Sequence, residues 1–294
     1  MGEQEPVVAI LAEEWGAIDA LLRGLEASEW ELPTECPGWT VRDVVSHLVG
    51  TERSLLGDPE PERPSPAPAH VRNPVGAGNE AWVAARRSRP GAEVAEEFRA
   101  VTGRRLSELR AAPAERFAAP GPSPVGVVPY REFMHVRVMD CWVHEQDIRV
   151  ATGRPGHDDG PAARLSLDRL ASGLPFVVGK QAAAPEGSAV TVDVRGPLAR
   201  RVDIVVRDGR AVVRDAPVSG GAPGRPDDTV HSDDTVHSDD TVHPDVTLHM
   251  DTDTFWRLTC GRMTGDAARH AGLVTLDGDG DLGDRVLGAM AFMI

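Results

Sequence analysis

The spacing of apolar residues changes character once along this chain of 294 residues, and that change constrains the fold more than any other feature. In the first half, apolar side chains recur every three or four positions, which is the period of one helical face. The segment 152–156 (TGRPG) breaks this pattern, and period-two alternation follows, as in Val190, Val192 and Val194. We therefore predict a helical domain over 1–155 and a smaller mixed α+β domain over 156–294.

The first domain is predicted to be built from long amphipathic helices. Thr40 can cap the second of them, because Asp43 follows three positions later, an arrangement close to a capping box. The proline-rich segments 58–78 and 113–129 are predicted to be loops. The expected helices cover 7–28, about 40–55, 79–88, 92–111 and 130–151.

The second domain is predicted to combine short strands with helices. Asp208 and Gly209 form a hairpin signal between two of the strands. Strands are expected near 190–194, 202–206, 212–213, 246–250 and 274–276. Helices are expected over 161–173, 253–261, 266–271 and 281–293.

A tandem hexad, DDTVHS, occupies residues 227–244, and histidines recur every six residues at His231, His237, His243 and His249. Residues six apart share one face of a strand, so a metal-binding histidine ladder is conceivable. We favour an acidic surface loop lengthened by duplication, because the tract is low in complexity and has no cradle of other ligands.

The formal charge of −15 argues against nucleic acid and against an anionic membrane surface, since both require a basic face. The sequence contains no run of about 18 apolar residues, so no membrane span is expected. The acidic start predicts no signal peptide, and the three cysteines form no CxxC pair, so we expect a reducing cytoplasm. A small-molecule partner is expected.

Asp140 and His144 lie four apart on a patterned helix, which places both side chains on one face within reach of one metal ion. His47 lies within the apolar register of another helix. It is either a core histidine or a third ligand, since bundle cores hold metals between facing helices. Three ligands and one open position are typical of catalytic zinc. Asp147 either accepts an imidazole N–H or is an ordinary surface carboxylate.

Three segments of the first domain resemble the mycothiol-dependent maleylpyruvate isomerase family, whose N-terminal domain is a DinB-like four-helix bundle. They are 30–48 (WELPTECPGWTVRDVVSHL), 73–83 (NPVGAGNEAWV) and 139–156 (MDCWVHEQDIRVATGRPG). The segments 251–268 and 274–290 resemble the sterol-carrier-like domain that these proteins carry. The resemblance implies a four-helix bundle followed by a mixed α+β domain.

The same resemblance implies that His47, Asp140 and His144 bind Zn²⁺ or another divalent metal. The family's isomerase has glutamate where this chain has Asp140, so the metal is expected closer to this helix. The resemblance also implies mycothiol as a low-molecular-weight thiol partner. A metal-bound thiolate would then attack a small electrophilic substrate, with isomerisation or transfer as the outcome. We name Arg262 as the catalytic candidate for holding a substrate carboxylate.

Two alternatives remain open at this stage. A metal-dependent hydrolase would keep water in the open position and need no thiol. A non-catalytic protein would carry a small ligand in the second domain and hold a structural metal in the bundle. A fourth protein ligand, with Cys141 or Asp147 as the first candidates, would favour that last alternative.

Overall fold

The fold is described from a computed structural model, which covers residues 5–124, 126–214 and 243–293. The chain forms two compact units, Met1–Ala171 and Ser172–Ile294. Helix α7 (Gly160–Ser172) therefore lies largely with the first unit, whereas the sequence placed it beyond a boundary at 155. Its Arg169 donates a hydrogen bond to Glu132 of the bundle, 3.2 Å between Nη1 and Oε2, which ties α7 to that unit.

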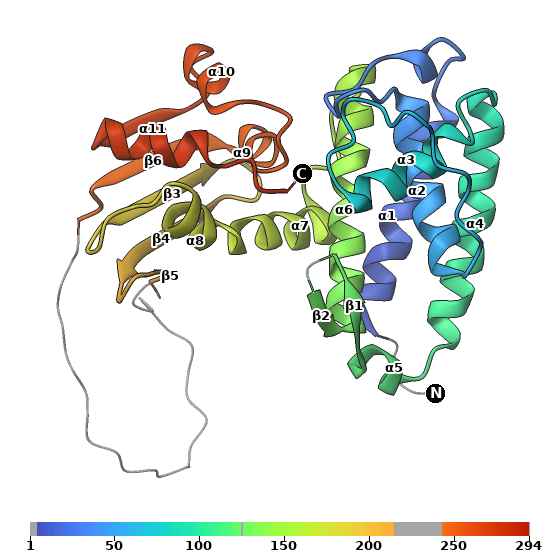
Figure 1. Cartoon of the computed structure of the whole chain (residues 1–294), viewed down its shortest axis with the longest axis horizontal. Helices are drawn as coiled ribbons and strands as arrows, with labels where there is room; N and C mark the ends of the chain where they lie inside the picture. The colour runs from blue at the N-terminus through green and yellow to red at the C-terminus, as the bar shows by residue number, and fades with distance from the viewer. Residues whose placement is uncertain (1–4, 125, 215–242, 294) are drawn as a thin grey trace. The chain divides into compact units, whose positions relative to one another are not determined.

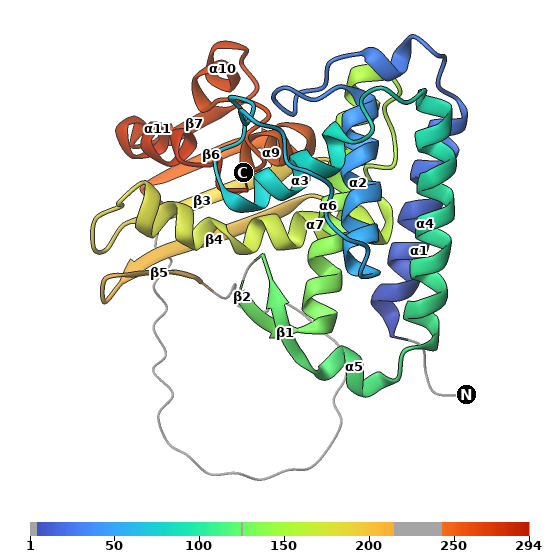
Figure 2. The same ribbon diagram turned by 45° about the vertical axis from the view of Figure 1, so that its right-hand side comes forward.

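The first unit is a bundle of four long helices that run side by side, as Figures 1 and 2 show. A shorter helix, α3 (Pro74–Ala84), packs against one of them. The chain between the last two long helices forms α5 (Ala114–Ala118) and the antiparallel pair β1 (Pro120–Ser123) and β2 (Gly126–Pro129). The long helices are α1 (Pro6–Arg23), α2 (Val41–Leu55), α4 (Gly91–Ala111) and α6 (Tyr130–Thr152).

Side-chain caps fix where two of these helices begin. The predicted capping box is present, because the Thr40 hydroxyl accepts from the Asp43 backbone N–H and the Asp43 carboxylate accepts from that of Thr40. Helix α3 begins at Pro74, five residues before its predicted start at 79. The Asn73 side chain accepts from the Gly76 backbone N–H at 2.8 Å, and proline suits the first helical position.

The prediction of a continuous loop over 113–129 was wrong. This stretch forms α5 and the hairpin of β1 and β2, with Gly121 opposite Val128. Its prolines and glycines are typical of loops. The two strands bury little of their surface, so they carry no alternating apolar pattern that would predict them.

The second unit contains a five-stranded sheet in the order β5-β4-β3-β6-β7. Strands β3 and β6 pair in parallel, and the other neighbours are antiparallel. The Asp208–Gly209 turn joins β4 and β5 with φ of 53° and 70°, as a two-residue hairpin turn requires. The strands are β3 (Ala189–Arg195), β4 (Arg200–Arg207), β5 (Arg210–Val213), β6 (Val246–Asp251) and β7 (Thr275–Gly278).

One face of this sheet is apolar and carries the core of the unit. The predicted alternation is confirmed: Val190, Val192 and Val194 are buried, and so are Val246 and Leu248 on the neighbouring strand. Helices from the end of the chain contact these strands. The remaining helices of the unit are α8 (Leu174–Phe176), the π-helix η2 (Val177–Gln181), α9 (Thr252–Thr259), α10 (Gly265–His270) and α11 (Gly280–Gly288).

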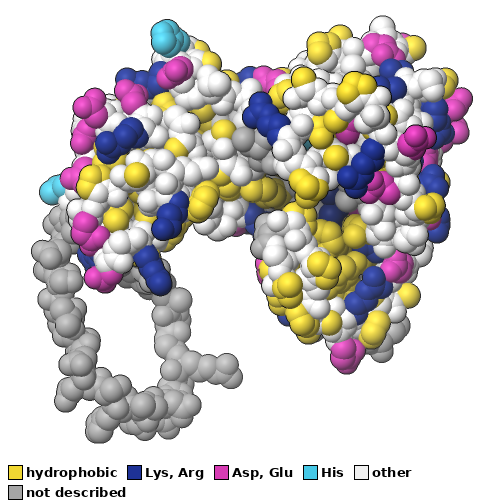
Figure 3. Space-filling view, in the orientation of Figure 1, with side chains coloured by type: hydrophobic (Ala, Val, Ile, Leu, Met, Phe, Trp, Pro, Cys, Tyr) yellow, Lys and Arg dark blue, Asp and Glu magenta, His cyan; other side chains and the backbone are white. Residues whose placement is uncertain are grey.

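Two further observations bear on possible partners. Among the described residues, no helix combines the length and the apolar character needed to cross a bilayer. On the face of each unit drawn in Figure 3, Arg and Lys side chains are interspersed with Asp and Glu. The expectation that nucleic acid is not a partner stays a prediction. Nearly all of the hexad tract, 227–242, lies outside the described residues.

A close approach between α2 and α3 gives a test of the bundle packing. A Cβ added at Gly50 would overlap Cβ and Cγ of Trp82, whereas one at Gly103 of α4 would meet nothing within 4 Å. We expect Gly50→Ala to lower the free energy of unfolding by about 1–3 kcal/mol through overpacking. Gly103→Ala is the matched control and should raise it by up to about 1 kcal/mol, since alanine favours helix. Urea unfolding of both variants measures this, and equal effects would contradict the packing described.

Candidate metal centre

Three side chains from two helices converge in the bundle. His47 comes from α2, and Asp140 and His144 come from successive turns of α6. His47 Nε2 lies 3.3 Å from Asp140 Oδ2, and His144 Nε2 lies 3.8 Å from Asp140 Oδ1. One potential ligand atom from each residue lies within 4.8 Å of the others. The structure thus brings together all three residues that the sequence proposed as ligands.

The surroundings of His47 and Asp140 favour the protonation states that metal ligands need. Burial lowers the pKa of His47, although Asp140 opposes this, so the neutral imidazole is favoured. Burial alone would raise the pKa of Asp140, but the Arg137 guanidinium and His47 hold it well below its usual range. Neutral imidazole and ionised carboxylate are the forms that bind divalent cations.

Asp147 orients one of the imidazoles. Its carboxylate is fully buried, and Oδ2 lies 2.9 Å from His144 Nδ1. A proton on Nδ1 donated to this carboxylate leaves Nε2 as the acceptor that faces Asp140. The Nδ1 atom of His47 is buried and has no hydrogen-bond partner among the described residues.

Trp39 covers the pair of histidines. Its ring lies 5.2 Å from that of His47 and 6.1 Å from that of His144, measured between centroids. The indole N–H donates to Glu80 Oε2 at 3.1 Å, and His70 Nε2 lies 2.9 Å from the same oxygen. The Glu80 carboxylate on α3 therefore holds the Trp39 indole over the imidazoles, and it also connects this indole to His70 in the preceding loop.

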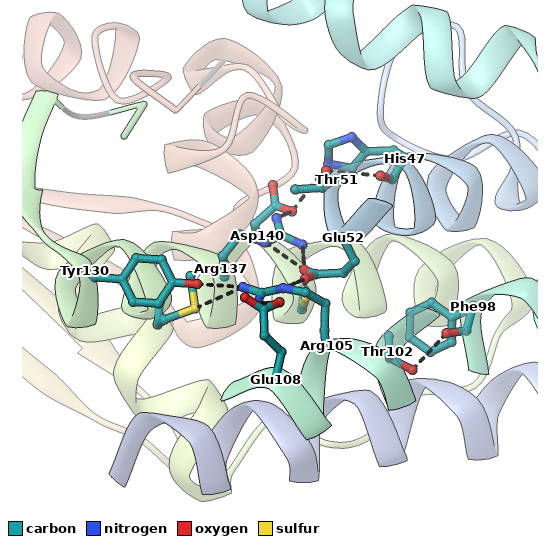
Figure 4. Close-up of polar contacts among 12 residues, drawn as sticks. His47, Thr51, Glu52, Phe98, Thr102, Arg105, Glu108, Tyr130, Arg137 and Asp140 are labelled. Carbon is teal, nitrogen blue, oxygen red and sulfur yellow. Dashed lines mark hydrogen bonds and ion pairs between the residues drawn. The ribbon is translucent and has the colours of Figure 1, made fainter. Parts of the chain in front are cut away.

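A buried ion network lies next to His47 and Asp140 (Figure 4). Arg137 donates from Nη1 to Asp140 Oδ2 at 2.5 Å and from Nη2 to Glu52 Oε1 at 2.8 Å. Arg105 donates from Nε to Glu52 Oε2 at 3.1 Å and from Nη2 to the Tyr130 hydroxyl at 2.7 Å. The Asp140 carboxylate is thus held by an arginine that is itself anchored in the core.

Sequence reasoning missed this network, although a signal for it exists. Glu52 continues the buried stripe of Val41, Val45 and Leu48 on α2, and an acidic residue on such a stripe requires a buried partner. Arg137 lies one turn before Asp140 on α6, within reach of both carboxylates.

The donor set fits a divalent transition metal. Two imidazoles and one carboxylate suit zinc, and three protein ligands leave one position for an exogenous group. Cys141 is fully buried, and burial raises the pKa of its thiol well above the usual value. Arg137 Nη2 lies 3.6 Å from its sulfur, so the thiol faces the ion network as an inert core group.

Arg262 lies in the second unit, after α9. Its Nη1 donates to the Cys260 carbonyl oxygen at 2.8 Å. The contact that Arg262 was predicted to make with a substrate carboxylate stays a prediction.

Comparison with known sequences supports the sequence-based family. Residues 11–149 match the family described as the mycothiol maleylpyruvate isomerase N-terminal domain. An uncharacterised protein of Mycobacterium tuberculosis H37Rv is 32% identical over 155 residues, which are 52% of this chain and 59% of the relative. A second uncharacterised protein of that strain is 29% identical over 161 residues, 55% of this chain and 74% of the relative. This chain thus spans less than two thirds of the first relative's length.

Comparison with solved structures extends over both units. The crystal structure of the mycothiol-dependent maleylpyruvate isomerase gives a TM-score of 0.55 at 16% identity, covering 92% of this chain and 91% of that one. A histidine-to-alanine mutant of that enzyme gives a TM-score of 0.54 at 15% identity. At this identity, the likeness establishes the fold.

Fold and site together define a protein class in which a helical bundle with convergent histidine and aspartate side chains precedes an α+β unit. Residues 11–149, which form most of the bundle, match the model of the mycothiol maleylpyruvate isomerase N-terminal domain family. The whole fold is that of the mycothiol-dependent maleylpyruvate isomerase. The predicted resemblance to this family and the predicted fold class are confirmed.

The contact between Asp147 and His144 predicts how strongly a metal is held. We expect Asp147→Asn to weaken Zn²⁺ affinity about 10- to 100-fold, because the amide accepts the His144 N–H less strongly than the carboxylate does. Competition with a chelator of known affinity measures the change. Asp158→Asn, at an exposed position, is the control and should bind like wild type. Unchanged affinity of Asp147→Asn would show that this carboxylate does not act on a ligand.

Proposed function

We propose that this protein is a divalent-metal-dependent enzyme that uses the thiol of mycothiol as a nucleophile toward a small electrophilic substrate. The observation that carries the proposal is the convergence of His47, Asp140 and His144 within 4.8 Å in a bundle of this family. A solved structure with the same fold is described as a mycothiol-dependent maleylpyruvate isomerase, which supports both the thiol and the reaction class.

The residues present indicate what each part of the site contributes. His47, Asp140 and His144 would hold the cation, and Zn²⁺ fits this donor set. A divalent cation, when bound, lowers the pKa of a thiol beside it and so supplies a thiolate at neutral pH. The half-exposed Asp140 carboxylate marks the side of the cluster that remains open to solvent, from which thiol and substrate would approach.

The surrounding side chains keep this arrangement in one geometry. Asp147 holds the His144 ring with Nε2 facing Asp140. Arg137 prevents the Asp140 carboxylate from rotating away, because its guanidinium is also bound to Glu52. Trp39 covers the imidazoles with an apolar ring and excludes water from that side.

In an isomerisation, the thiolate sulfur forms a bond to one carbon of a conjugated cis double bond, and the π electrons move onto the conjugated carbonyl. The remaining C–C single bond rotates, the double bond re-forms as trans, and the sulfur leaves with its electron pair. In a transfer, protonation of the adduct ends the reaction. Arg262 remains the candidate for a substrate carboxylate under this proposal, since a guanidinium binds it bidentately.

The first test measures metal content of the purified full-length protein by mass spectrometry. We expect His144→Ala to bind one equivalent of Zn²⁺ fewer than wild type, because three ligands become two. His135→Ala, on the same helix and outside the cluster, is the control and should bind as wild type does. Equal metal content in wild type and His144→Ala would contradict the proposed metal centre.

The second test separates the thiol mechanism from its alternatives. With maleylpyruvate as probe, we expect turnover to fall at least roughly 100-fold when mycothiol is left out, and similarly in His144→Ala with mycothiol present. Hydrolytic turnover of a probe without thiol would instead indicate a metal-activated water. Bound metal with neither activity would favour a ligand-binding protein with a structural ion.

A further inference from the structure

A second cluster of ionisable side chains lies in the bundle, between α1 and the chain that follows α6. It consists of Glu14 on α1, Glu145 on α6 and His157 in the segment after α6. His157 Nδ1 lies 2.6 Å from Glu145 Oε2 and 3.7 Å from Glu14 Oε2. A potential ligand atom from each residue lies within 4.8 Å of the other two. Both carboxylates are fully buried.

Glu14 is the unusual member of this cluster. Neither of its carboxylate oxygens has a hydrogen-bond partner among the described residues, although the side chain is 0% exposed and directed at Glu145 and His157. The charge of Glu145 is already engaged, because Arg149 binds its Oε1 from Nε at 2.8 Å and from Nη2 at 2.7 Å. A buried carboxylate without a hydrogen bond is costly, so Glu14 must carry a proton, pair with a protonated His157 or share a cation.

The backbone at His157 holds the imidazole in a fixed position. Its φ is 55°, in the left-handed region that few side chains other than those of glycine adopt. Trp142 Nε1 and Gln146 Nε2 donate to the His157 carbonyl oxygen at 2.9 Å and 3.3 Å and hold this conformation. Strained residues held in place by several contacts are characteristic of functional sites. Here the turn directs an imidazole nitrogen at two carboxylates, of which Glu14 has no hydrogen-bond partner among the described residues.

We propose that Glu14, Glu145 and His157 form a second divalent-cation site, separate from the one at His47, Asp140 and His144. Two carboxylates and one imidazole suit a transition-metal ion of the zinc and manganese class. Arg149 binds Oε1 of Glu145 from outside this site and would keep Oε2 directed toward the ion. The ion would tie α1 to the end of α6 and to the segment that follows it. This inference does not depend on the proposed enzyme activity.

The test counts Zn²⁺ equivalents in the full-length protein after dialysis against excess metal and then against buffer. We expect two equivalents in wild type and one in Glu14→Gln, which removes the charge and keeps the shape. His144→Ala should bind one, and the double variant none. Glu13→Gln, an exposed neighbour that loses the same charge, is the control and should bind two.

A second variant keeps the test decisive if Glu14→Gln folds poorly by circular dichroism. Asparagine tolerates a positive φ, so His157→Asn removes the imidazole while preserving the turn. We expect it to weaken binding of the second equivalent at least about 10-fold. One equivalent in wild type that His144→Ala abolishes overturns the proposal and assigns a shared proton to the two carboxylates. Unchanged stoichiometry in Glu14→Gln with unchanged affinity in His157→Asn does the same. One equivalent in wild type that persists in His144→Ala and is lost in Glu14→Gln counts against the first centre only.

Discussion

The bundle depends most on the ion pairs that the buried Glu52 carboxylate makes with two arginines. It is 1% exposed, and its two oxygens are bound by Arg105 of α4 and Arg137 of α6. One acidic group of α2 thereby joins three of the four long helices. Removing one partner of a buried ion pair typically costs about 3–5 kcal/mol, because the remaining charge stays in the core. Since Arg137 also binds Asp140, the packing that stabilises the bundle also positions a proposed ligand.

Features set by local chemistry could be predicted from the sequence. The capping box of Thr40 and Asp43, the Asp208–Gly209 hairpin and the alternation of Val190, Val192 and Val194 each depend on neighbours a few positions away. The i, i+4 spacing of Asp140 and His144 placed both on one helical face for the same reason. The juxtaposition with His47 required the family resemblance, because nothing local specifies which helix faces which.

Other features depend on contacts between distant segments and gave weak signals. Glu14 lies on the apolar face of α1, together with Leu11, Trp15 and Ile18. Its partners Glu145 and His157 lie more than a hundred residues further along the chain. The hairpin of β1 and β2 is hidden by its own prolines, which usually mark loops. A charged residue on an apolar helix face indicates that a distant partner exists, but the local sequence does not identify that partner.

The hydrogen bond from Arg137 to Asp140 bears on the metal selectivity of the proposed site. An arginine hydrogen bond to Oδ2 disfavours bidentate binding of an ion by this carboxylate, so Asp140 would bind the proposed ion through one oxygen. Calcium needs six to eight oxygens, and magnesium keeps most of its water when protein donors are few. Two imidazoles and a single carboxylate oxygen instead match small ions that accept low coordination numbers. Under the proposed function, Arg137 would thereby favour zinc-like ions over calcium and magnesium, although it makes no contact with the ion itself.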